Sequence, residues 1–151
     1  STGKIINVIQ SSLISGQHDV DIIDNKTISI FNNESFHTTN GFELINQVSS
    51  IIHYSFDTKE FKKMHSKILE NSNFGTRFGG LIQYLNDKSF IVEEQEHGRI
   101  LYIDNKDELI WSYINKANNG KVYVLRWSSI VEDEDKAFKI KKIINEKKCI
   151  N

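Results

Sequence analysis

The chain has 151 residues, of which 38% are hydrophobic and 26% are charged, and its formal net charge is -1 at pH 7. These values indicate one soluble globular domain and exclude a disordered chain or a membrane-spanning protein. A nearly neutral chain lacks the basic surface that gathers nucleic acid, so we expect no direct nucleic-acid binding and no membrane contact. The single cysteine, Cys149, excludes an intrachain disulfide, and this is typical of a cytoplasmic protein.

The first third of the chain predicts strands joined by short turns. Residues 4–14 carry a run of isoleucines, valine and leucine that fits either a buried strand or a short amphipathic helix. Two strands follow, at about residues 19–23 and 27–31, around the turn Asp24-Asn25-Lys26. We therefore expect the first antiparallel hairpin here.

Residues 32–47 are polar and predict a loop, and residues 49–56 predict a further strand. The next segment, residues 57–70, has two interpretations. Asp57 and Glu60 have the spacing of a capping box, and apolar residues follow at helical spacing, so local physics favours a helix or helical turn.

The segment from Gly80 to Tyr113 predicts four successive strands, with turn residues between them. Asn86-Asp87-Lys88 supplies the first turn, Gly98 the second and Asp104-Asn105-Lys106 the third. The expected strands cover residues 81–85, 89–94, 99–103 and 109–113. Together they form one antiparallel unit of the size of a propeller blade.

An internal repeat links this unit to the first hairpin. Residues 20–30 and residues 82–92 share the same order of apolar strand, Asn/Asp/Lys turn and returning strand. Repeats of this kind are typical of stacked or radial units. The repeat calls for an outer strand within residues 57–70, against the helix that local physics favours.

The last part of the chain predicts a strand and a helix. Asn118-Asn119-Gly120 marks a turn before an alternating segment at residues 121–131. Acidic residues then begin a helix that we expect to run to about Lys148 and to pack on the sheet or on a partner.

The predicted fold is therefore mainly β, with two or three propeller-like antiparallel blades, a C-terminal helix and room for one internal helix. We expect a single domain with a first unit at about residues 16–70, a second at 80–115, and a final strand and helix at 121–151.

Three short motifs resemble the blade sequences of bacterial arylsulfotransferase-like β-propellers. They are Gln17-His18-Asp19, then Phe31-Asn32-Asn33, then Gly98-Arg99 with Trp111. Asn32 stands where the family pattern has aspartate. The resemblance implies a propeller whose central funnel passes a sulfuryl group through a histidine, and His18 is the residue that matches that position. A complete propeller needs about 4 to 8 blades, more than this chain holds.

The candidate site residues each have a functional and a structural interpretation. His18 beside Asp19 fits a nucleophile with an orienting carboxylate, or a strand-edge pair that bonds to backbone. The other histidines lack metal-ligand spacing, so we expect no metal and no cofactor. A cluster of carboxylates fits an acidic docking face or the charged protection of a strand edge; its members are Glu93, Glu94, Glu96, Asp104, Asp107 and Glu108.

We expect a non-catalytic module that binds another protein, most concretely a bacterial immunity or antitoxin protein whose acidic face covers a basic nuclease-type toxin. The alternative is a fragment or half-propeller of an arylsulfotransferase-like enzyme that acts through His18. Such a fragment needs further blades, so a homo-oligomer stays open.

Overall fold

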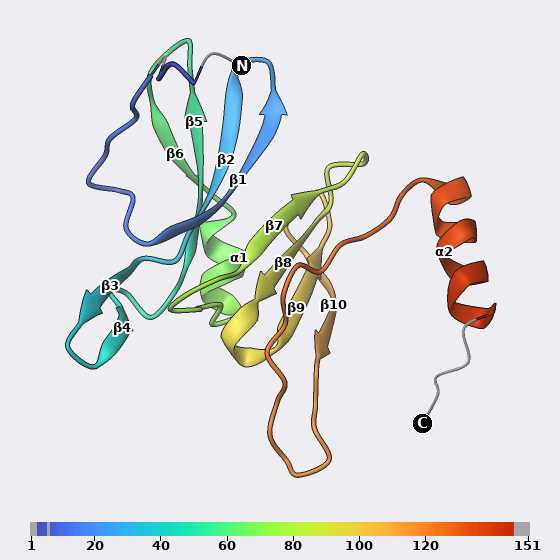
Figure 1. The fold of residues 1–151 in the computed structure, drawn as a ribbon. Coiled ribbons are helices and arrows are strands. Elements are labelled where there is room, and N and C mark those ends of the chain that lie inside the picture. The colour runs from blue at the N-terminus through green and yellow to red at the C-terminus, as the bar shows by residue number, and fades with distance from the viewer. Residues whose placement is uncertain (1–2, 6, 147–151) are drawn as a thin grey trace.

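The computed structural model describes residues 3–5 and 7–146. The predicted chain end around Cys149 lies outside these residues. Within them the fold is mainly β, with two four-stranded antiparallel sheets, a separate two-stranded hairpin and short helices (Figure 1). The predicted fold class is therefore confirmed.

The first sheet follows the chain in the order β1 (Gln17–Asp24), β2 (Thr27–Asn32), β5 (Ser50–Ser55) and β6 (Phe61–Met64). Asp24 closes the first turn, because its carboxylate accepts a hydrogen bond of 2.7 Å from the backbone N–H of Lys26.

The second sheet has the same organisation, in the order β7 (Leu81–Tyr84), β8 (Phe90–Glu94), β9 (Arg99–Ile103) and β10 (Leu109–Ile114). A 3-10 turn, η1 (Gln95–His97), precedes Gly98, which has a positive φ of 58°. Asp87 lies in the β7–β8 turn, where its carboxylate accepts a hydrogen bond of 2.9 Å from the backbone N–H of Ser89, as Asp24 does from that of Lys26. The two copies of the repeat therefore form equivalent blade-like sheets.

The two sheets enclose a core between them. β1 contacts β7, so the first strands of the two sheets lie next to each other. The helix α1 (Ser66–Asn71) contributes Leu69, and Phe31 meets Phe74 edge to face at 5.9 Å. The fully buried members of this core are Phe31, Ile51, Leu69, Phe74, Ile82, Phe90, Val92, Leu101 and Ile103.

The opposite face of the first sheet is covered by the N-terminal segment. Ile9 and Ile14 pack on a cluster formed by Ile30, Ile52 and Tyr54. The described part of this segment forms neither the strand nor the amphipathic helix that its periodicity allowed. An irregular backbone is enough to place its apolar side chains on the sheet.

Two expectations for the first half are wrong in detail. Residues 57–70 do not form one helix, because the outer strand β6 pairs with the free edge of β5 and only the remainder becomes α1. The polar stretch expected as a loop contains a hairpin, β3 (Ser35–Thr38) with β4 (Gly41–Leu44). Pairing at a strand edge satisfies backbone N–H and C=O groups, and the local sequence pattern does not show which edges are free to pair.

The strand expected over residues 121–131 does not form. The segment makes a single bridge, between Lys116 and Val122, and then crosses the face of the second sheet. Its N–H groups bond elsewhere: those of Ser128 and Ile130 donate to the side chains of Glu93 and Gln83. The sheet is already complete with four strands.

The helix α2 (Glu134–Glu146) stands apart from both sheets in Figure 1, and none of its residues is buried. Of the two placements expected for this helix, packing on the sheet is therefore wrong, and packing on a partner stays a prediction. Among the residues described, no helix has the length and apolar character needed to cross a membrane.

Candidate functional site

His18 occupies an extra position in β1. Gln17 pairs with Asn32 and Asp19 pairs with Phe31, so two steps on β1 face one step on β2. This is a β-bulge, a distortion that re-aims side chains and recurs next to active sites. Here it directs the exposed imidazole of His18 toward the start of β7.

The second sheet selects one tautomer of the neutral imidazole. Nδ1 of His18 lies 3.1 Å from the carbonyl oxygen of Gly80, which can only accept a hydrogen bond. Nδ1 therefore carries the proton, and Nε2 of the neutral ring keeps its lone pair. The indole of Trp127 lies beside the ring, with centroids 6.4 Å apart.

Asp19 does not orient His18, contrary to the catalytic interpretation. Its carboxylate faces β7, where Oδ2 lies 3.4 Å from the backbone N–H of Ile82. Asp19, Asp21 and Gln83 line a shallow pocket of about 250 Å³ beside Trp127. Burial, and then the charge of Asp19, raises the pKa of Asp21.

Three members of the expected acidic docking face lie at the end of β8 and in η1, and two of them are buried. Glu93 and Glu94 are only 1% and 2% exposed. Glu94 accepts hydrogen bonds of 2.6 Å from the side chain of Arg99 and from the backbone N–H of Gly75. Glu96 pairs with Arg77 at the edge of the same region. These carboxylates tie loops to the sheet, so the predicted face is wrong for Glu93 and Glu94.

The other three predicted carboxylates lie together in the β9–β10 turn. Asp104 shapes the turn, because its Oδ1 accepts hydrogen bonds from the N–H groups of Lys106 and Glu108. Glu108 is exposed. Asp107 reaches across to the first sheet, where its Oδ1 lies 2.5 Å from Nδ1 of His65.

Sequence reasoning missed a chain of polar side chains that begins at this contact. Nε2 of His65 lies 3.0 Å from the hydroxyl of Tyr84, and Nε2 of His53 lies 3.0 Å from the same hydroxyl. Burial raises the pKa of Tyr84, and burial followed by the charge of His65 lowers the pKa of His53. The four residues come from separate elements, so no spacing in the sequence relates them.

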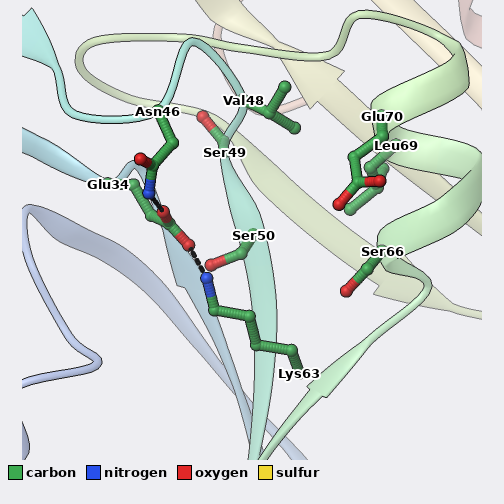
Figure 2. Close-up of a pocket in the computed structure, with 9 residues that line it drawn as sticks. All are labelled: Glu34, Asn46, Val48, Ser49, Ser50, Lys63, Ser66, Leu69 and Glu70. Carbon is green, nitrogen blue, oxygen red and sulfur yellow. Dashed lines mark hydrogen bonds and ion pairs between the residues drawn. The ribbon is translucent and has the colours of Figure 1, made fainter.

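A second pocket, of about 290 Å³, lies between β5, β6 and α1 (Figure 2). In Figure 2 the amide of Asn46 and the ammonium of Lys63 both point at the carboxylate of Glu34. Both contacts occupy this carboxylate. Glu34 precedes β3 and Asn46 follows β4, so these contacts fasten the ends of the β3–β4 hairpin to each other and to Lys63 of β6.

The motif Phe31-Asn32-Asn33 is also structural. Asn32 bonds to the backbone of Leu13 and Ser15, and Asn33 donates to the carbonyl groups of Thr76 and Gly79. Both amides are buried and fasten loops to the end of β2.

Comparison with known proteins supports the relationship that the motifs predicted. Neither a curated protein nor a solved structure matches the chain. Residues 3–116, which include both four-stranded sheets, match the family described as arylsulfotransferase (ASST). The chain therefore belongs to the arylsulfotransferase family.

Proposed function

We propose that this chain forms two neighbouring blades of an arylsulfotransferase-type propeller, in which His18 carries the sulfuryl group once further blades complete the funnel. Family membership supports the class of reaction. The adjacent first strands β1 and β7 support the position, because the innermost strands of neighbouring blades line the channel of a propeller.

The observation that carries this proposal is the bulge at His18. The bulge turns the imidazole toward β7, and the Gly80 carbonyl keeps the proton on Nδ1. A neutral imidazole with a free Nε2 lone pair is the form that attacks an electrophile. A histidine that only fastened a strand edge would not need the extra residue.

The reaction proceeds in two displacements at sulfur. The Nε2 lone pair of His18 attacks the sulfur atom of an aryl sulfate and forms an N–S bond. The bond between sulfur and the phenolic oxygen breaks, and a phenolate leaves. The oxygen of a second phenol then attacks the same sulfur atom, loses its proton to the released phenolate or to solvent, and breaks the N–S bond. The cycle returns the imidazole to its starting state.

The test uses 4-nitrophenyl sulfate as donor and phenol as acceptor, over a range of chain concentrations that covers any self-assembly. We expect release of 4-nitrophenolate and a sulfuryl group on His18, detected by mass spectrometry. The variant His18→Gln should lose both signals, while His37→Gln, at an exposed histidine on β3, should keep them. Transfer that persists in His18→Gln, or an unmodified His18 in an assembled and folded sample, would refute the proposal.

Binding of another protein is a second candidate, and exposed aromatic residues favour it. Trp127 is 72% exposed and Tyr123 is 61% exposed, and aromatic anchors of this kind dominate protein interfaces. The narrower immunity or antitoxin hypothesis depended on an acidic face, and the burial of Glu93 and Glu94 removes its support. Tyr123→Ala, at the exposed aromatic that does not lie beside His18, should then weaken capture of a partner without changing sulfuryl transfer to His18.

A further inference from the structure

Two imidazole nitrogens from different segments converge on one phenol oxygen. His53 lies on β5, His65 lies between β6 and α1, and Tyr84 lies on β7 of the other sheet. Each Nε2 is 3.0 Å from the Tyr84 oxygen. Two ligands that each lie about 2.0–2.1 Å from a transition-metal ion are themselves separated by roughly 3 Å.

The far side of one imidazole has the arrangement that metal-bound histidines require. Nδ1 of His65 lies 2.5 Å from the carboxylate of Asp107, so the ring donates its proton there and directs Nε2 inward. Histidines that bind metals usually donate their other ring N–H to a carboxylate or a carbonyl, which fixes the tautomer. Asp107 is therefore placed as a positioning residue for His65.

The surroundings favour a cation over an anion. Asp21 and Asp107 act electrostatically on Tyr84, and Asp24 acts on His53, against the ammonium groups of Lys62 and of Lys88, which lines the same cavity. The hydroxyl of Ser29 lies near Tyr84, is fully buried, and has no hydrogen-bond partner among the described atoms. A cavity of about 550 Å³, lined by His53, His65 and Tyr84, gives access from solvent.

We propose that His53, His65 and Tyr84 bind one divalent first-row transition-metal ion, with Cu²⁺ bound more tightly than Zn²⁺. Imidazole ligands suit both ions, and the order of affinities for a given site places Cu²⁺ above Zn²⁺. No group of three or more His, Cys, Asp or Glu side chains is arranged around one point in the described residues. The third ligand in this site is a phenol.

Binding changes the proton balance and the contact between the sheets. The ion takes the lone pairs of two neutral imidazoles, and the phenol oxygen of Tyr84 bonds to it while one proton leaves for solvent. The ion joins the first sheet to β7, so it should raise the stability of the folded chain in proportion to its concentration. This proposal does not depend on sulfuryl transfer by His18.

Isothermal titration calorimetry of the full chain with Cu²⁺ or Zn²⁺, repeated in buffers of different ionisation enthalpy, tests the site. We expect one ion per chain, proton release on binding, and a raised thermal midpoint. Tyr84→Phe should lose proton release and at least tenfold in affinity. Asp107→Asn, at an exposed turn, should weaken binding by about 10- to 100-fold. His37→Gln, at an exposed histidine on β3, should bind as the parent chain does.

Far-UV circular dichroism first establishes that each variant is folded, and Asp107→Asn carries the test if Tyr84→Phe is not. The proposal is overturned if neither ion binds. It is equally overturned if Asp107→Asn and a folded Tyr84→Phe bind as the parent chain does, or if His37→Gln abolishes binding, since the ion then occupies surface histidines.

Discussion

Replacement of Glu94 by alanine tests whether the central carboxylates hold the fold together or face a partner. Glu94 is 2% exposed, and its two oxygens bond to the backbone N–H of Gly75 and to the side chain of Arg99. His97 lies 3.3 Å away as a further neighbour. Glu94→Ala removes all of these contacts at once.

The expected loss follows from the groups left behind. The buried N–H of Gly75 loses its acceptor, which costs about 1–3 kcal/mol. Arg99 loses its ion pair but still donates to the carbonyl groups of Ser72 and Asn73, and its side chain is 23% exposed. Breaking a fully buried ion pair costs roughly 3–5 kcal/mol, so we expect only part of that loss here. We expect a total loss of about 3 kcal/mol.

Urea unfolding followed by far-UV circular dichroism measures this loss. With a slope of about 2 kcal/mol per M, the midpoint should fall by about 1.5 M. The matched control is Glu96→Ala, whose partner Arg77 is 51% exposed, and it should cost about 1 kcal/mol or less. Equal losses for the two variants, or a loss below about 1 kcal/mol for Glu94→Ala, would refute the reasoning.

Three further predictions use the same unfolding assay. Gly80→Ala should cost about 3 kcal/mol, because a Cβ would lie 2.6 Å from a core ring at a φ of +90°, while Gly120→Ala, in open space, should cost about 1 kcal/mol. Phe74→Ala should cost about 3–5 kcal/mol, whereas Phe138→Ala on α2 should change stability by no more than about 0.5 kcal/mol. Burial acts to raise the pKa of Glu34, but hydrogen bonds, first that from Lys63, hold this pKa below the ordinary 4.5. The ionised carboxylate therefore stabilises the folded chain above pH 4.5, and this stabilisation is lost as the pH falls through the lowered pKa. Glu34→Gln should flatten this dependence of unfolding on acid pH.

Local chemistry was enough to predict the paired hairpins. The turns at Asp24 and Asp87 use side chains that bond to nearby backbone, and the flanking strands are rich in β-branched residues. Such turns set the register of a hairpin without help from the rest of the molecule. The repeat and the fold class followed from these two segments, whereas the family resemblance rested on separate short motifs such as Gln17-His18-Asp19.

The elements without a strong local signal were decided by the sheets. Residues 61–64 carry a helical spacing, yet they pair with β5 because its edge would otherwise be left with unsatisfied backbone groups. Residues 121–131 alternate like a strand, yet they form only one bridge, between Lys116 and Val122. The N–H of Ser128 bonds to the side chain of Glu93 instead of to a strand edge, so the segment stays irregular.

The candidate sites divide in the same way. His18 could be singled out from its own motif, but the bulge that aims it at Gly80 depends on pairing with β2 and on contact with β7. His53, His65, Tyr84 and Asp107 are separated by up to 54 positions along the chain, and only the packing of one sheet on the other brings their side chains together. Sequence by itself determined the paired hairpins and their turns, because those depend on neighbours along the chain. Tertiary structure alone decided which carboxylates are buried and which histidines meet, because those depend on contacts between distant segments.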